Sequence, residues 1–257
     1  MTDPFYVHIP NRGLIELEGE DAVPFLQRLI SNDMALLETQ PAIYACLLTP
    51  QGKFLHDFFV SRGPNVILLE CEGGARAHDL FERLKKYRLR AKVNISVEDN
   101  VPVFACFNNT PDASYPDPRH AEMGHRAFIH PEGAEEKPFE IYDEHRIRLG
   151  IPDGSRDAEL ERSTLAELNL DKLNAVSFQK GCYVGQELTA RMEYRGLAKK
   201  HLVAITGKSL PSPFLPLEID GEELGEMRSS CGNVGLALIR DADREKLNDT
   251  DQIRLLG

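Results

Sequence analysis

Apolar positions in the first hundred residues repeat with two different periods. Helix-like spacing, with apolar side chains on one face, covers residues 19–30 and 78–87, and Asp21 is the expected N-cap of the first helix. Alternating or continuous apolar runs typical of strands lie at 5–19, 42–48, 54–60, 65–71 and 93–97. The turn sequence T-P-Q-G between two of these runs predicts a hairpin. The resulting order, β-α-β-β-β-α-β, predicts an α+β unit close to a split ferredoxin-like arrangement.

Regular periodicity weakens in the middle of the chain and returns near its end. Residues 108–120 and 130–138 are rich in turn-forming residues and are expected to be loops. Between and after them we expect a strand at 127–129, a helix at 141–146 and a partly helical segment at 160–168. Beyond residue 199, short strands and the turn pair Asp220-Gly221 predict a small β-barrel. We therefore expect three subdomains, at residues 1–100, 101–198 and 199–257.

Composition and charge narrow the class of protein. The 257 residues are 42% hydrophobic and 28% charged, as in ordinary globular proteins. A formal net charge of -11 argues against direct binding of nucleic acid, and the basic run at 83–92 is expected to be a solvated helix face. No apolar stretch approaches the roughly 20 residues that span a bilayer, and residues 1–10 lack the features of a signal peptide. We expect a cytoplasmic protein without membrane partners.

The five cysteines contain no pair with metal-site spacing. They stand at positions 46, 71, 106, 182 and 231, and no C-x-x-C occurs, so a zinc site or iron–sulfur cluster held by this chain alone is not predicted. Four of them lie in apolar or mixed strand-like text and are expected to be small core residues. Cys182 differs, because it lies in the segment K-G-C-Y-V-G-Q-E at 180–187.

Residues around Cys182 suit a reactive thiol beside a bound heterocycle. Gly181 and Gly185 permit positive φ and close backbone approach, and the cation Lys180 would stabilise a thiolate. Gln186 and Glu187 offer an amide and a carboxylate for paired hydrogen bonds. From these residues alone, a glycine-rich turn with an incidental cysteine is an equally good explanation.

A longer comparison favours the functional explanation. The segment K-G-C-Y-V-G-Q-E closely resembles the K-G-C-[YF]-x-G-Q-E signature of the YgfZ family. The resemblance continues in T-A-R at 189–191 and R-G at 195–196, in R-L-G-I-P at 148–152, in E-L-N-L at 167–170 and in F-L-Q and S-N-D at 25–33. It therefore covers most of the chain, although only the signature is sharply specific.

The resemblance implies a fold, a cofactor and partners. The fold would be α+β and similar to the T-protein of the glycine cleavage system, with several subdomains in a ring and a C-terminal barrel. The cofactor would be tetrahydrofolate, and the partners would be iron–sulfur assembly machinery or client enzymes, including those that modify tRNA. Cys182 and Lys180 would be the working pair. The expected folate-binding residues, most of them in or near the signature, are Asn32, Asp33, Tyr183, Gly185, Gln186, Glu187 and Arg195.

Some of these assignments have structural alternatives. An Asn-Asp pair after a helix is frequently a turn or cap, which is the competing explanation for Asp33. Tyr183 suits either pterin stacking or the core, and Arg195 suits either the glutamate tail of folate or the surface.

Two rival functions share the expected fold. A folate-dependent aminomethyltransferase would carry paired aspartates in a G-x-x-x-D-D turn, but this chain reads G-K-F-L-H-D at 52–57. A histidine at position 56 cannot supply a fixed negative charge near neutral pH, which argues against that chemistry. The other rival is a non-catalytic folate-binding scaffold, and the residues leave open whether any reaction is catalysed.

Overall fold

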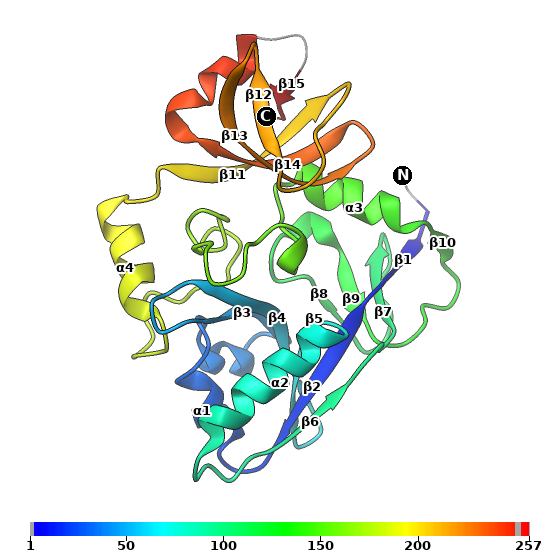
Figure 1. Ribbon diagram of the computed structural model, residues 1–257. Coiled ribbons are helices and arrows are strands. Elements are labelled where there is room, and N and C mark those ends of the chain that lie inside the picture. Colours follow the sequence, from blue (N-terminus) through cyan, green and yellow to red (C-terminus); the bar gives the residue numbers. More distant parts are fainter. Residues whose placement is uncertain (1–2, 250–252, 257) are drawn as a thin grey trace.

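The computed structural model describes residues 3–249 and 253–256. Three five-stranded sheets and four α-helices make up most of the described chain, with the C-terminal sheet at one end (Figure 1). The first sheet has the order β3-β4-β5-β2-β6 and every pairing in it is antiparallel. Its strands are β2 (Arg12–Glu18), β3 (Ala42–Leu48), β4 (Phe54–Gly63), β5 (Val66–Glu72) and β6 (Asn94–Glu98). The predicted hairpin is confirmed, because β3 pairs with β4 around the T-P-Q-G turn.

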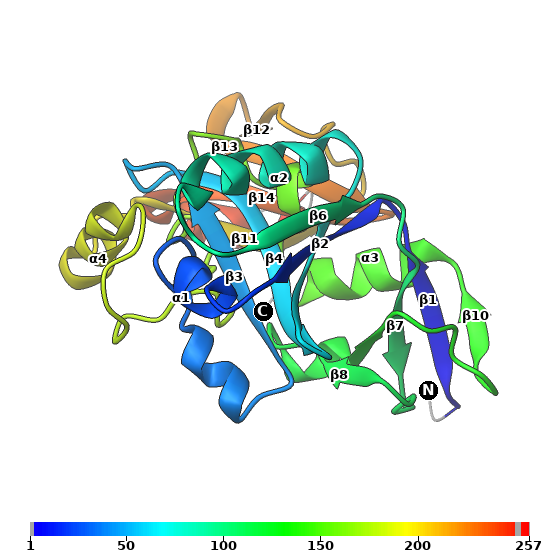
Figure 2. The same ribbon diagram turned by 90° about the horizontal axis from the view of Figure 1, so that it is seen from below.

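Both faces of the first sheet are covered. On one face the sheet packs against α1 (Ala22–Gln27) and α2 (Ala75–Arg88), and Figure 2 shows α2 running across the strands. On the other face it packs against the second sheet and the long connection that follows it. Burial on both faces explains why β3 is apolar along its whole length instead of alternating.

The first helix differs in detail from the expectation for residues 19–30. It is six residues long, and the Asp21 side chain does not cap it. Instead, Oδ2 of Asp21 accepts a hydrogen bond from the backbone N–H of Lys92, 2.8 Å away. A long-range partner has therefore replaced the local cap that the sequence predicted. The chain continues through a short 3-10 helix, η1 (Met34–Glu38).

The second sheet has the order β10-β1-β7-β9-β8. Its strands are β1 (Phe5–Ile9), β7 (Val103–Phe107), β8 (Ser114–Pro116), β9 (His125–Ala127) and β10 (Glu135–Lys137). The N-terminal strand thus joins residues 103–137 instead of the first sheet, which the order of elements alone could not show. Strands β8 and β10 lie inside segments expected to be loops, because each is only three residues long and carries turn-forming neighbours.

Helix α3 (Phe139–Arg148) confirms the predicted helix at 141–146 and packs against the C-terminal sheet. That sheet has the order β12-β13-β14-β11-β15. Its strands are β11 (Lys200–Gly207), β12 (Pro216–Ile219), β13 (Glu222–Cys231), β14 (Val234–Arg240) and β15 (Ile253–Leu255). The predicted turn at Asp220-Gly221 joins β12 to β13. The remaining helices are 3-10 turns η2 (Ala121–Met123), η3 (Gly154–Arg156), η4 (Asp241–Asp243) and η5 (Glu245–Asp249), and α4 (Gln186–Arg195).

A long connection without regular helix or strand runs from η3 to α4, within the described chain. The expected helical segment at 160–168 lies here and is a series of turns. Thr164 and Glu167 hydrogen-bond each other's backbone N–H in a capping box, which begins a helical turn. Asn169 then adopts a positive φ of 55° and ends it after one turn.

Candidate functional site

The signature loop lies on the turn that follows α1. Lys180 is buried, and its ammonium donates to the carbonyl oxygens of Ile30 at 2.8 Å and Asn32 at 2.6 Å. Burial lowers the pKa of Lys180 to about 8, although the charge of Asp33 opposes the shift. These contacts make Lys180 an anchor of the loop. Its expected action on the Cys182 thiol remains a prediction.

Ser31 joins the same two segments through its hydroxyl group. Its Oγ donates to the Ala175 carbonyl at 2.6 Å and accepts from the Cys46 N–H at 2.8 Å. A backbone bond from the Ser177 N–H to the Ser31 carbonyl, 3.0 Å long, extends the pairing. The chain before Cys182 is therefore held against β3 and the turn after α1.

Two glycines lock the other end of the loop. Gly185 has a φ of 83°, and a Cβ there would lie 2.6 Å from the Thr49 carbonyl oxygen. Gly52, in the hairpin turn, has a φ of 76°, and a Cβ on it would lie 2.8 Å from the Gly185 carbonyl oxygen. Both positions require glycine. Gly181 does not, because its φ is not positive and open space surrounds it, so the expectation for that residue was wrong.

Between these anchors Cys182 is exposed, and it is the only one of the five cysteines that is. Burial raises the pKa of the Cys71 thiol to about 12 and that of Cys106 to about 11, and it also raises the pKa of Cys46 well above its usual range. Cys231 is half-buried, and its Sγ donates to the Glu140 carbonyl oxygen. Among the five thiols, that of Cys182 is therefore the most accessible to solvent.

The expected folate-binding residues occupy three kinds of position. Asn32 is buried, and its amide Nδ2 donates to the carbonyls of Tyr44 and Asn174, both at 2.8 Å. Asp33 accepts from the Ala35 N–H and so caps η1, which is the structural alternative weighed above. Tyr183 is buried in the core with the Lys180 ammonium 5.1 Å from its ring centroid.

Of the other four, Gly185 is the N-cap of α4, and three lie on this helix, which is at one side of the molecule in Figure 1. Gln186 begins this helix, and Glu187 pairs with Arg191 on its exposed surface. Arg195 is exposed at its last turn. The structure therefore does not gather the predicted residues around one cavity.

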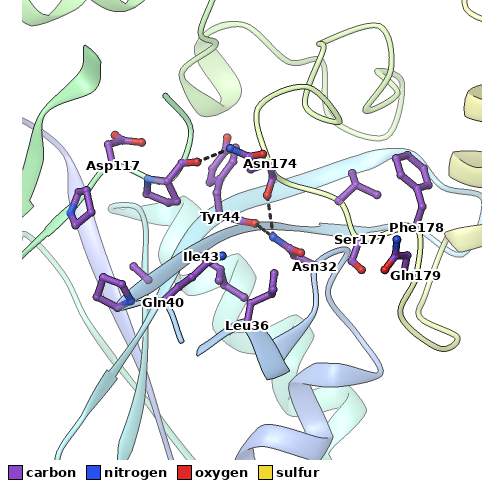
Figure 3. Close-up of a pocket in the computed structure, with 15 residues that line it drawn as sticks. Asn32, Leu36, Gln40, Ile43, Tyr44, Asp117, Asn174, Ser177, Phe178 and Gln179 are labelled. Atoms are coloured by element: carbon purple, nitrogen blue, oxygen red, sulfur yellow. Dashed lines mark hydrogen bonds between the residues drawn. The ribbon is translucent and has the colours of Figure 1, made fainter. Parts of the chain in front are cut away.

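A pocket of about 600 Å³ opens beside the residues that precede the signature (Figure 3). Of the predicted site residues, only Asn32 lines it. Phe178 and Val176 give it apolar walls, and the exposed side chains of Gln40 and Gln179 offer amides at its rim. The mixture of an aromatic wall and amide groups suits a planar heterocycle.

His56 and Asp57 lie on opposite faces of β4, as alternation along a strand requires. His56 points toward α2, where its Nε2 lies 2.8 Å from Oδ2 of Asp79, and burial lowers its pKa to about 4. Asp57 faces the interior, where it accepts a hydrogen bond of 2.6 Å from the Tyr44 hydroxyl. Burial raises the pKa of Asp57. The interior thus contains the carboxylate of Asp57. Position 56, where the sequence comparison looked for an aspartate, is a histidine on the opposite face of the strand.

Sequence reasoning missed a buried ionic network between the first two sheets. Glu70 accepts from Nε of Arg12 at 2.8 Å and from Nε of Arg126 at 2.9 Å. Beside it, Arg119 donates to Asp117 at 2.7 Å. Burial alone would raise the pKa of Glu70, but the two guanidinium groups outweigh it and lower the pKa to about 2. The one available signal was a glutamate inside the apolar run I-L-L-E-C of β5.

Metal-ligating side chains do not gather anywhere in residues 3–249 and 253–256: no group of three or more His, Cys, Asp or Glu is placed to hold an ion. No helix in this part of the chain is long and apolar enough to cross a membrane. Cys182 is therefore not part of such a group within the described chain.

Known proteins resemble this chain in sequence and in fold. The iron-sulfur cluster assembly factor IBA57, mitochondrial, of Homo sapiens is 32% identical over 272 residues, covering 90% of this chain and 76% of that protein. The Mus musculus protein of the same name is 31% identical over 275 residues. Residues 199–251 match the family model of the CAF17 C-terminal β-barrel domain.

One solved structure gives the fold. Glycine cleavage system aminomethyltransferase T from Bartonella henselae superposes with a TM-score of 0.73, covering 95% of this chain and 80% of that chain. Sequence identity is 15%, so this likeness shows the fold alone. The fold is T-protein-like α+β with a C-terminal half-barrel, as predicted.

Proposed function

This chain belongs to the family of the iron-sulfur cluster assembly factor IBA57, and from that premise we propose that it assists assembly or repair of iron–sulfur clusters while binding tetrahydrofolate. Its clients would include enzymes that modify tRNA. Cys182 would be the working thiol. The net charge of -11 makes client proteins, instead of tRNA itself, the expected partners.

One observation carries the proposal: Cys182 is the only exposed cysteine, on a loop held at both ends. Thiolates are the usual protein ligands of iron–sulfur clusters. A single thiol cannot hold a cluster, and no further ligand set stands nearby in the described chain. A cluster touched by Cys182 would therefore take its other ligands from a partner protein, as expected for a factor that acts on clusters in transit.

Tetrahydrofolate fits the pocket beside the loop better than it fits the residues predicted from the signature. Asn32 has its amide occupied by backbone carbonyls, whereas Gln40 and Gln179 have exposed amides and Phe178 supplies a ring. These three side chains would hold a pterin, and folate would supply one-carbon chemistry when bound. Loss of tetrahydrofolate binding in Phe178→Ala, with Tyr87→Ala as a control on α2, would test this assignment. Unchanged binding in Phe178→Ala would place folate elsewhere.

The thiol itself is tested in a strain that lacks the protein. Wild-type, Cys182→Ala and Cys231→Ala chains are expressed at matched levels, and the products of iron–sulfur tRNA-modifying enzymes are measured. We expect Cys231→Ala to restore them and Cys182→Ala to leave them at the level of the empty strain. Full restoration by Cys182→Ala would rule out the proposed role of this thiol.

An aminomethyltransferase is a second candidate because of Asp57. Its carboxylate faces the interior beside the Tyr44 hydroxyl and has a raised pKa, which is typical of a group that exchanges protons. Folate-dependent methylene transfer from a lipoyl-carried or free amine, abolished in Asp57→Asn, would favour this function over the first. No transfer with either donor would exclude it.

A further inference from the structure

A second cavity, of about 320 Å³, lies where the first sheet meets α3 and η3. It has no lining residue in common with the pocket of Figure 3. Four charged side chains, one aromatic ring and one amide dominate its wall: Arg12, Glu72, Asp153, Arg156, Phe139 and Asn11. Nothing in the proposed iron–sulfur function uses this cavity.

Arg12 brings an incompletely used guanidinium to the cavity. More than nine-tenths of the residue is buried, and its Nε is committed to Glu70. Among the described residues, none accepts a hydrogen bond from Nη1 or Nη2, and neither nitrogen is sealed from solvent. Arg126, on the same glutamate, uses all three of its nitrogens. Arg12 therefore keeps two free donors in the fork geometry that grips a carboxylate in bidentate fashion.

Asp153 brings the opposite charge. Its Oδ2 accepts from Nη1 of Arg156 at 2.9 Å, while no described residue donates to Oδ1, which is also open to solvent. Burial alone would raise its pKa, but Arg146, Arg156 and Arg12 lower it, so the carboxylate stays ionised at neutral pH. The cavity thus offers a free donor pair and a free ionised acceptor.

Glu72 adds to the negative side of the cavity. Its Oε1 accepts from the Ser155 hydroxyl at 2.7 Å, and the Ser155 N–H donates to Oε2 at 3.2 Å. These bonds hold the carboxylate in place, and Nε of Arg76 also donates to Oε2, at 3.4 Å. Two carboxylates repel an inorganic phosphate dianion, and two guanidinium groups repel a simple amine. A molecule that carries both charges avoids both penalties.

We propose that this cavity binds a small free amino acid, whose carboxylate lies on the Nη atoms of Arg12 and whose ammonium group faces Asp153. The volume is near the lower end of the range for ligand pockets and excludes large molecules. The Phe139 ring, with the Arg156 guanidinium 5.6 Å from its centroid, forms an apolar wall for the short side chain. The proposal is independent of Cys182 and stands or falls separately.

The test is calorimetric titration of the full chain with glycine, L-serine and L-glutamate, and with acetate, methylamine and inorganic phosphate. We expect saturable binding of at least one amino acid at millimolar concentration and weaker binding of each fragment that carries one charge. Arg12→Lys keeps the charge but loses the fork, and Asp153→Asn removes the acceptor. Each should weaken binding by about tenfold or more, as expected for loss of a bidentate or charged contact.

Arg148→Lys is the matched control, since Arg148 lies on α3 and pairs with Glu144 on the exposed surface. It should bind like wild type. If circular dichroism shows that Arg12→Lys is unfolded, the proposal is still tested by the affinity of Asp153→Asn and by the binding of the single-charge fragments. Absence of saturable amino-acid binding, equal binding of acetate or phosphate, or unchanged affinity in a folded Arg12→Lys or Asp153→Asn chain would overturn the proposal.

Discussion

The interior between the first two sheets and the signature loop use their polar groups in opposite ways. In the interior, Glu70 and Arg126 are almost completely buried and are satisfied by each other and by neighbouring side chains. On the loop, the buried ammonium group of Lys180 donates to backbone carbonyls, while Cys182 is exposed to solvent. Buried polar groups therefore hold the two sheets and the loop in place. The group left accessible to a partner is the exposed Cys182 thiol.

The largest expected effect comes from breaking the interior network. Glu70→Gln removes the charge that Arg12 and Arg126 share and leaves two buried guanidinium groups without their common carboxylate. Loss of one member of a buried ion pair costs about 3–5 kcal/mol of the free energy of unfolding. Urea denaturation measures it, with Glu82→Gln on the exposed surface of α2 as the control. A loss below that of the control would show that the network does not hold the sheets together.

The pH dependence of stability tests burial on the other face of the first sheet. His56 has a folded pKa of about 4, below the 6.5 of the unfolded chain, so the folded state keeps it neutral. Its contribution is complete above pH 6.5 and is lost as pH falls toward 4, by about 3 kcal/mol in total. Denaturation midpoints measured across this range should fall less steeply in His56→Gln. Identical slopes would mean that folding does not lower the pKa of His56.

Substitution of a glycine that fixes the loop should lower the free energy of unfolding less than Glu70→Gln does. Gly185→Ala places a Cβ against the Thr49 carbonyl at positive φ, and such strain costs about 1–3 kcal/mol. Gly181→Ala, where nothing lies near the added methyl, should change stability by no more than about 0.5 kcal/mol. Gly196 also has a positive φ, but no atom lies near an added Cβ. Gly196→Ala therefore measures the cost of the backbone conformation without that of a clash. Equal losses at 185 and 181 would remove the argument that this loop is locked.

Much of the fold followed from the sequence because its elements carry strong local signals. The hairpin at 42–60, the helix at 78–87, which the structure extends to Ala75–Arg88, and the C-terminal strands were predicted from periodicity and turn residues. Pairings between distant segments were not. β1 joins β7 across nearly a hundred residues, and Asp21 bonds to Lys92, because such contacts depend on tertiary packing that no local pattern records.

The site was predictable only in part, for a similar reason. The exposure of Cys182 agrees with its special position in the signature, and Gly185 has the backbone that glycine allows. Asn32, Asp33 and Tyr183 turned out to be occupied within the fold, since their partners come from segments far away in sequence or from local caps. The signature therefore indicated where the loop lies but not which of its side chains are free.

The most direct test of this account is the alkylation rate of each cysteine in the native protein, followed by peptide mass spectrometry with iodoacetamide. The account predicts that Cys182 is modified first and that Cys46, Cys71 and Cys106 react only after unfolding, with the half-buried Cys231 in between. Full unfolding in urea should make the five rates similar. Modification of Cys231 or of any buried cysteine as fast as Cys182 in the native protein would contradict the claim that one thiol alone is offered to a partner.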